Sequence, residues 1–303
     1  MERKKVIQSD AILFATALIW GFAFVAQKEG MEHIGPFTFN AIRFVLGTLT
    51  LIPILFWRKK KALRPPVRKT KINLMQAGLI AGTALFLGAT FQQTGIKYTT
   101  AGNAGFITSL YVIFTPILGL FIGMIPKLRV WLGAILATFG LYLLTVNGNF
   151  EISSGDLLVL ICAVFYAVHV HLIGWLSPHF SSYKLAMLQF LVAGLMSSIA
   201  AILSEPIVWA WIQKALLPLL YVGVLSTGLA FTLQIIGQKI ALPSHAAIIL
   251  SFEAVFAAIG GWLMLGESFS LKGIIGCILM FAGIIIAQIN LFRKTKTNLI
   301  YKL

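Results

Sequence analysis

The chain has 303 residues, of which 59% are hydrophobic and 11% charged, and its formal net charge is +15. A soluble protein of this length needs a far more charged surface. Runs of about 20 apolar residues are long enough to cross a bilayer as helices. The composition therefore excludes a soluble globular protein and predicts an all-α integral membrane protein.

Ten apolar segments follow one another along the chain, and each predicts a transmembrane helix. They cover residues 11–30, 36–57, 74–95, 102–124, 130–146, 156–176, 183–203, 215–237, 245–265 and 273–292. The first segment is longer than the apolar part of a typical signal peptide, so we expect an uncleaved helix. The connections are short, so we expect no soluble domain outside the membrane.

The 24 lysines and arginines are distributed unevenly among the connections. If the N-terminus is cytoplasmic, most of them lie on the cytoplasmic side, as the positive-inside rule requires. The richest segment, RKKKALRPPVRKTK at 58–71, lies between the second and third predicted helices. A loop beside anionic lipid headgroups explains this segment better than a nucleic-acid site. We therefore expect a protein of the cytoplasmic membrane with both termini in the cytoplasm and no nucleic-acid partner.

The two halves of the chain share an internal similarity. The polar and glycine identities between segments 90–123 and 232–265, at a shift of 142 residues, include Gln92/Gln234, Gly95/Gly237, Lys97/Lys239 and Ser109/Ser251. At a shift of 146, Asp10 meets Asp156 and Trp20 meets Tyr166. The shared polar positions indicate a duplicated unit.

The repeat defines two predicted domains, residues 1–147 and 148–303, with five helices in each. Because five is an odd number, the second unit must be inverted in the membrane relative to the first. Inverted repeats around a site near the midplane are typical of secondary transporters. The sequence therefore predicts ten transmembrane helices in two inverted five-helix repeats.

Three stretches carry a resemblance to a known family: LIWGFAFVAQK at 18–28, GDLLVLICAVFYAVHV at 155–170, and ALPSHAAIILSFEAVFAAIGGWLMLGESFSLKGIIGCILMFAG at 241–283. They resemble EamA-type members of the drug/metabolite transporter superfamily, and the resemblance extends over nearly the whole chain. It implies two inverted five-helix repeats and export or exchange of amino acids or similar small metabolites. The first half differs from the second in having Tyr111 where the second has Glu253.

Glu253 is the acidic residue in the middle of the ninth predicted helix. At 1.5 Å per residue it lies roughly 12 Å from the start of that helix, near the midplane. An ionised carboxylate there costs a few kcal/mol, so it should face a cavity, find a partner or bind a proton. Two interpretations stay open: a functional group, with proton coupling as one role, or a hydrogen bond that fixes the helix to its neighbour.

Arg43 and His169 are further ionisable residues inside predicted helices. Arg43 is a candidate partner for an anion or a carboxylate, unless its long stem extends to the interface. Tyr166 and His169 share a helix face and are candidates for a proton relay or a substrate contact; the alternative is a histidine hydrogen-bonded within the bundle. His169 and His171 point in different directions, so we expect no metal site from them.

The other candidates for a substrate pathway are aromatic and polar residues at positions that mostly correspond between the two halves. They are Trp20, Gln92, Asn103, Tyr111, Gln234, His245 and Ser251. The alternative for the aromatic residues is packing, and for the polar residues it is hydrogen bonding between helices.

The sequence favours a secondary transporter that moves small metabolites by alternating access, as an exporter or exchanger, and not an enzyme. A lipid flippase and an intramembrane enzyme are the alternatives. The enzyme alternative lacks a His-Glu-x-x-His motif or paired aspartates, and no Walker A motif is present. We expect no cofactor and no metal. The expected partners are a small-molecule substrate and the lipid bilayer, with the protein a monomer or homodimer.

Overall fold

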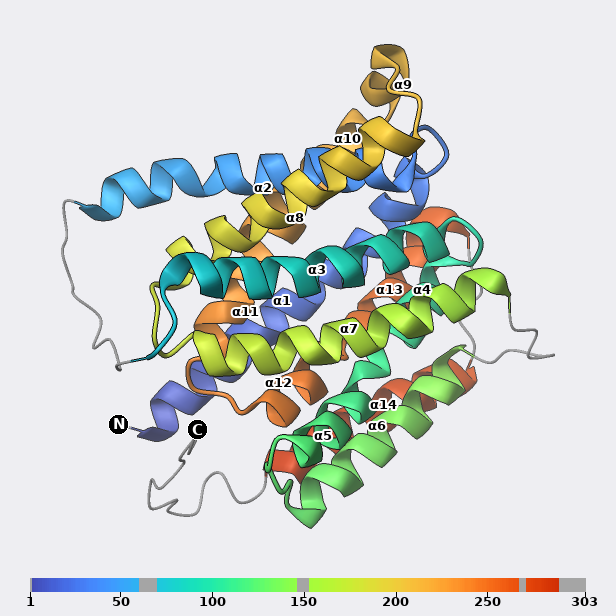
Figure 1. The fold of residues 1–303 in the computed structure, drawn as a ribbon. Helices are drawn as coiled ribbons and strands as arrows, with labels where there is room; N and C mark the ends of the chain where they lie inside the picture. Colours follow the sequence, from blue (N-terminus) through green and yellow to red (C-terminus); the bar gives the residue numbers. More distant parts are fainter. Residues whose placement is uncertain (1, 60–69, 146–152, 267–270, 289–303) are drawn as a thin grey trace.

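The computed structural model describes residues 2–59, 70–145, 153–266 and 271–288, and these ranges form a bundle of helices (Figure 1). In the first half the helices are α1 (Glu2–Gly30), α2 (Pro36–Lys59), α3 (Leu74–Ile96), α4 (Ala101–Ser109), α5 (Tyr111–Phe121) and α6 (Leu128–Thr145). In the second half they are α7 (Ser154–Leu176), α8 (Ser182–Ser204), α9 (Trp209–Lys214), α10 (Leu216–Leu220), the π-helix η1 (Tyr221–Phe231), α11 (Thr232–Gly237), α12 (Pro243–Leu250), α13 (Glu253–Leu265) and α14 (Leu271–Gln288).

The expected all-α membrane architecture is confirmed, but not with ten full-length spans. Within the described residues, 8 helical stretches are long and apolar enough to cross a membrane. The fifth and tenth expected spans correspond to the shorter apolar helices Leu128–Gly140 and Leu271–Ala287. Residue 146 and residues 289–292, which were included in those spans, lie outside the described residues.

The first helix begins earlier than expected, and an extra helix occurs in an expected loop. α1 starts at Glu2 and not near residue 11, and α9 lies between the seventh and eighth expected spans. Hydropathy detects the part of a helix that is apolar enough for lipid, whereas backbone hydrogen bonding continues into polar residues. The apolar pattern therefore marks where a helix can contact lipid, and it does not mark where the helix ends.

The fourth and ninth expected spans, 102–124 and 245–265, are each interrupted near the middle. α4 and α5 meet at Leu110, where the backbone N–H donates to the carbonyl of Ile107, 3.2 Å away. α12 and α13 meet near Phe252, whose N–H donates to Ile249 at the same distance. In these hydrogen bonds the donor and acceptor residues are three positions apart, as in a 3₁₀-helix, and not four apart as in an α-helix. The two interruptions fall at positions that correspond between the halves.

The two halves of the chain interlock instead of forming separate bundles. α1 packs against η1, α11, α12 and α13 of the second half, and α7 packs against α3, α4 and α5 of the first (Figure 1). α2 lies against α8 and η1, while α6 pairs with α14. The described core consists of two apolar clusters, and the partly buried rings of Trp20 and Tyr166 pack against both.

Glycines allow several of these helices to approach closely. A Cβ atom on Gly95 of α3 would lie 2.7 Å from the carbonyl oxygen of Gly155 on α7. α6 and α14 meet in two such contacts, Gly133 with Gly283 and Gly140 with Gly276, where a Cβ atom would lie 2.7 and 2.5 Å from the facing carbonyl oxygen. Side chains at these positions would force the helices apart.

Polar contacts hold the first helix of each half at opposite ends of the bundle (Figure 1). Near the start of α1, His245 Nε2 donates to Asp10 Oδ1 at 2.8 Å. Near the start of α7, Thr99 Oγ1 donates to Asp156 Oδ1 at 2.6 Å. The two aspartates correspond to each other in the sequence repeat.

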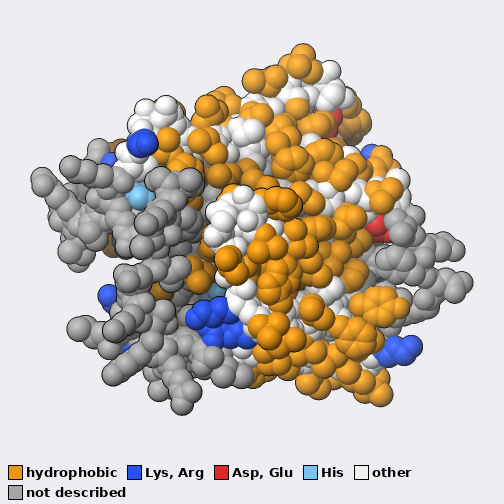
Figure 2. Space-filling view, turned by 60° about the horizontal axis from the view of Figure 1, so that its bottom comes forward, with side chains coloured by type: hydrophobic (Ala, Val, Ile, Leu, Met, Phe, Trp, Pro, Cys, Tyr) orange, Lys and Arg blue, Asp and Glu red, His pale blue; other side chains and the backbone are white. Residues whose placement is uncertain are grey.

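The outer surface is apolar, as contact with lipid requires. Figure 2 shows hydrophobic side chains over most of the described surface in view, with Lys and Arg side chains toward its margins. Exposed large side chains on α6 and α14 include Leu132, Phe139, Ile278 and Phe281. A soluble monomer rarely exposes an apolar area of this extent.

We predict that Gly95→Ala destabilises the protein, whereas Gly119→Ala in α5 does not. The new Cβ atom at Gly95 would meet backbone at 2.7 Å, but at Gly119 the nearest atom is 3.5 Å away. Overpacking costs about 1–3 kcal/mol, whereas alanine is favoured over glycine in a helix by about 1 kcal/mol. Thermal unfolding in detergent measures both effects. Equal melting temperatures for the two variants would contradict the close α3–α7 contact.

Candidate functional site

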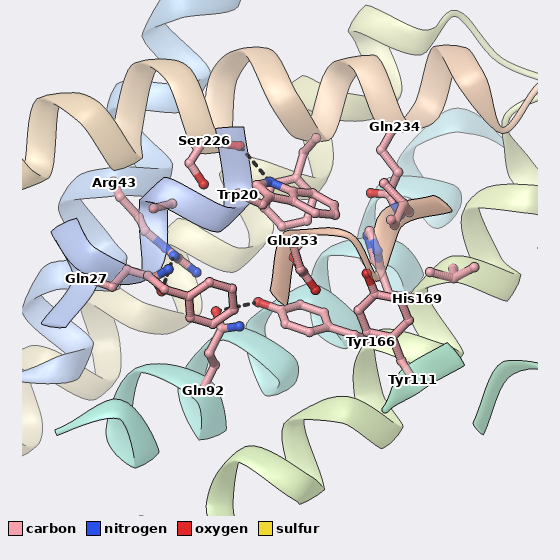
Figure 3. Close-up of a pocket in the computed structure, with 15 residues that line it drawn as sticks. Trp20, Gln27, Arg43, Gln92, Tyr111, Tyr166, His169, Ser226, Gln234 and Glu253 are labelled. Atoms are coloured by element: carbon pink, nitrogen blue, oxygen red, sulfur yellow. Dashed lines mark hydrogen bonds between the residues drawn. The ribbon is translucent and has the colours of Figure 1, made fainter. Parts of the chain in front are cut away.

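A cavity lies where helices of the two halves meet (Figure 3). It is lined by Trp20, Ala23, Phe24, Gln27, Arg43, Gln92, Tyr111, Tyr166, His169, Val170, Ser226, Phe231, Gln234, Leu250 and Glu253. The centres of water-sized molecules can occupy about 30 Å³ within it.

Most of the residues predicted for the site line this cavity. They are Trp20, Arg43, Gln92, Tyr111, Tyr166, His169, Gln234 and Glu253. Asn103, His245 and Ser251 are not among the lining residues. Asn103 is in the first turn of α4, His245 binds Asp10 at an end of the bundle, and Ser251 Oγ donates to the carbonyl of Ile248. Asn103 lies eight residues before Tyr111, and His245 lies eight residues before Glu253, or roughly 12 Å along a helix in each case.

The two helix interruptions place corresponding residues in the cavity. Tyr111 is the first residue of α5 and Glu253 is the first residue of α13. The hydroxyl of Ser109, at the end of α4, lies 3.3 Å from the carbonyl oxygen of Ser251 and 3.5 Å from Glu253 Oε1. The interruptions therefore contact each other. The N-terminal position of Glu253 in α13 also favours a negative charge, because the helix dipole is positive there.

Arg43 reaches the same cavity from α2. Its side chain is 2% exposed, so it does not extend to the surface. One terminal nitrogen, NH1, donates to Gln27 Oε1 at 3.2 Å, whereas Nε and NH2 have no hydrogen-bond partner. The phenol of Tyr166 lies beside the guanidinium. No described carboxylate forms an ion pair with Arg43. The arginine is thus buried with unused donors.

A chain of hydrogen bonds joins three helices at the cavity wall. Tyr166 donates from α7 to Gln92 Oε1 on α3 at 3.2 Å, and Gln92 Nε2 donates to Thr108 Oγ1 on α4 at 3.2 Å. Both ends of the Gln92 side chain are therefore engaged. Of the two roles considered for Gln92, substrate contact and hydrogen bonding between helices, these contacts support hydrogen bonding between helices.

Aromatic rings and a histidine form another part of the wall. Trp20 Nε1 donates to the carbonyl of Ser226 at 3.2 Å, and its ring packs on Phe231 with the centroids 4.6 Å apart. His169 Nε2 lies 3.0 Å from Gln189 Oε1, and its ring meets Phe231 edge-on. His169 is thus both a lining residue and a histidine bonded within the bundle. A single apolar surface connects Trp20, Phe231 and His169.

Several lining residues were not singled out in the sequence. Gln27 and Phe24 lie on the same face of α1 as Trp20, with the spacing i, i+4, i+7. That spacing is the signal that would have identified them. Ser226 and Phe231 lie on η1. A π-helix presents side chains with a different period from an α-helix, so the α-helical periodicity does not predict which of its residues face the cavity.

Comparison with known proteins identifies the family. The model of the EamA-like transporter family matches the chain twice, over residues 8–146 and 153–288. The chain belongs to the EamA-like transporter family. The resemblance of the sequence to this family is therefore confirmed, and membership points to a transporter and not to an enzyme.

Relatives of this EamA-like chain match it over most of its length. An uncharacterized transporter of Archaeoglobus fulgidus is 32% identical over 292 residues, which cover 95% of this chain and 88% of that protein. The uncharacterized transporter YoaV of Bacillus subtilis is 25% identical over 290 residues, with 93% and 97% covered. A solved crystal structure superposes with a TM-score of 0.73 at 22% identity, covering 93% of this chain and 96% of that one. It has the same fold.

We predict that Tyr166→Phe destabilises this EamA-like chain more than Tyr111→Phe. Tyr166 donates to Gln92, whereas the Tyr111 hydroxyl has no hydrogen-bond partner. Removal of the Tyr166 hydroxyl would leave a buried amide oxygen without a donor, at a cost of about 1–3 kcal/mol. Melting temperatures of the two variants in detergent compare these effects. A larger loss for Tyr111→Phe would show that the bond from Tyr166 to Gln92 is not the stronger constraint.

Proposed function

We propose that this protein is a secondary transporter that moves small metabolites across the cytoplasmic membrane by alternating access. The observation that carries the proposal is the cavity, which lies between the two halves at helix interruptions in corresponding positions. Discontinuous helices near the midplane form the substrate sites of many secondary transporters. Arg43 and Glu253 supply charged groups in the cavity of a chain whose relatives are named transporters.

We infer further that the two halves are inverted repeats. Each of several contacts between helices has a counterpart formed by the corresponding residues of the other half. The 146-residue shift takes Ser9 to Gly155, and the 142-residue shift takes Gly95 to Gly237. Gly95 packs on Gly155, and Ser9 Oγ donates to the carbonyl of Gly237 at 2.8 Å. A shift of 143 residues takes Gly133 to Gly276 and Gly140 to Gly283. The contact of Gly133 with Gly283 therefore corresponds to the contact of Gly140 with Gly276. Such pairing is what a twofold axis between inverted halves requires.

Alternating access assigns roles to the two ends of the bundle. With the basic loops in the cytoplasm, the contact between Asp10 and His245 lies at the cytoplasmic end, and that between Thr99 and Asp156 lies at the outer end. One contact must separate while the other persists, because substrate reaches the cavity from one side at a time.

Amino acids and related compounds are the substrate class that we propose, with export or exchange as the mode. The cavity combines charged groups with the rings of Trp20 and Phe231, which suits a small amphipathic solute. Glu253 is the lining carboxylate and the proposed site of proton coupling, with His169 as a second candidate. We propose that both termini lie in the cytoplasm, as the distribution of basic residues favours.

A flux assay in proteoliposomes tests this function. Proteoliposomes that contain the purified protein are loaded with one amino acid at a time. Counterflow of the labelled compound is then measured with and without a pH gradient. We expect saturable flux for at least one amino acid. For Glu253→Gln we expect flux that no longer responds to the pH gradient, because the amide cannot exchange a proton. Absence of flux for every amino acid would reject the substrate class, and an unchanged pH response in folded Glu253→Gln would reject the coupling role.

We predict that cross-linking either end of the bundle stops transport. Cysteines replace Asp10 and His245 in one variant and Thr99 and Asp156 in another, in a background without Cys162 and Cys277. A short reducible cross-linker should abolish flux in each variant, because the cross-linked pair can no longer separate. Reduction of the cross-linker should restore flux. Single-cysteine variants treated identically are the control. Full flux in a cross-linked variant would contradict the assigned role of that contact.

A further inference from the structure

The cavity contains an acidic and a basic side chain that are not paired with each other. Arg43 is 2% exposed and Glu253 is 3% exposed, and both line the cavity. No ion pair joins them, although both are in the described part of the chain. Burying a charge without a partner is costly, so such groups are normally paired or hydrogen-bonded. Neither group therefore has an oppositely charged partner among the described residues.

The polar neighbours satisfy these two groups only in part. On the Arg43 side, two guanidinium nitrogens lack partners, and the nearby Gln27 engages only the third. On the Glu253 side, the hydroxyl of Ser109 donates across 3.5 Å, at the limit for a hydrogen bond, and the phenol of Tyr111 lies beside the carboxylate without a hydrogen bond of regular geometry. Figure 3 shows both charged side chains directed into the space beside the Trp20 ring.

We propose that Arg43 and Glu253 together select a dipolar substrate, with its carboxylate on Arg43 and its ammonium group on Glu253. This inference rests on the proposed transport function and specifies how that cavity recognises its solute. A zwitterion satisfies both buried charges in one step and leaves the net charge of the cavity unchanged. An anion satisfies only the arginine, and a cation satisfies only the glutamate. The guanidinium fork also suits a carboxylate, because two parallel hydrogen bonds form.

The remaining cavity wall indicates the rest of the substrate. Trp20, Phe24, Phe231 and Leu250 provide apolar surface beside the charged groups. Such surface binds an apolar or aromatic side chain. The chemical class is therefore a small zwitterionic amino acid with an apolar side chain, and L-phenylalanine and L-leucine serve as probes.

Ligand-dependent thermal stability tests the recognition separately from transport, because a ligand that binds the folded state raises the melting temperature. The purified protein in detergent is titrated with L-phenylalanine, its methyl ester, N-acetyl-L-phenylalanine and phenethylamine, and the leucine series is run in parallel. The ester and the amine lack the carboxylate, and the acetyl compound lacks the ammonium group. For the wild type we expect the free amino acid to bind at least about tenfold more tightly than each analogue, the fold-change of one charge-assisted hydrogen bond.

The variants assign each charge to its group. Arg43→Gln should abolish the preference for the free amino acid over its ester, and Glu253→Gln should abolish the preference over the acetyl compound. Arg43→Lys keeps a cation and should retain part of the carboxylate preference, which covers the case in which Arg43→Gln does not fold. Arg129→Gln on α6 and Glu32→Gln in the turn after α1 are matched controls outside the cavity and should preserve both preferences.

The outcomes separate this inference from the proposed function. Equal binding of the amino acid and its analogues, or preferences that survive both cavity substitutions, would overturn the dipolar site even if amino acids are transported. Absence of a thermal shift with either free amino acid would also overturn it. The expected preferences without flux in proteoliposomes would support the site and reject the transport function.

Discussion

The structure depends on the requirement that polar groups inside a membrane find their partners within the protein. Lipid offers no hydrogen bonds, so backbone groups must be satisfied within helices, and charged side chains must face a cavity or another polar group. Arg43 and Glu253 meet this requirement only in part. Their side chains line a cavity surrounded by both halves of the chain, and two nitrogens of the Arg43 guanidinium have no hydrogen-bond partner.

Close helix packing makes such a cavity compatible with a stable bundle. At the ends of α3 and α7 and along α6 and α14, glycines bring backbones into direct contact. Hydrophobic burial contributes little to helix association in lipid, so these contacts and a few hydrogen bonds hold the bundle together.

The helix interruptions connect this architecture to the site. A continuous helix would place Glu253 and Tyr111 in helical interiors with their backbone groups fully bonded. At the interruptions the two residues instead begin new helices, α13 and α5, and the neighbouring Ser109 and Ser251 make contact. The carboxylate thereby lies at a helix N-terminus, where the dipole favours its charge. This arrangement gives an electrostatic reason for an acidic residue at mid-depth.

Much of the bundle and part of the site were predictable from the sequence. Apolar runs identified the membrane segments, because a helix in contact with lipid needs apolar side chains along its length. Polar residues deep within these runs, such as Arg43, Tyr166 and Glu253, were recognised as candidates for the site. The repeat also paired Gln92 with Gln234, and both line the cavity. However, the same reasoning included Asn103 and His245, since correspondence in a repeat does not indicate depth along a helix.

The sequence by itself determined the membrane class, the family and which residues carry charge into the apolar interior, because these follow from composition and local pattern. Only the tertiary structure decided where the helices break, that η1 is a π-helix, and that Gln27 and Phe231 join the wall. It also decided that Arg43 and Glu253 share one cavity without pairing. These features depend on contacts between segments that are distant in the sequence, such as Trp20 with Ser226 and Ser109 with Ser251, and local sequence patterns contain no information on which segments meet.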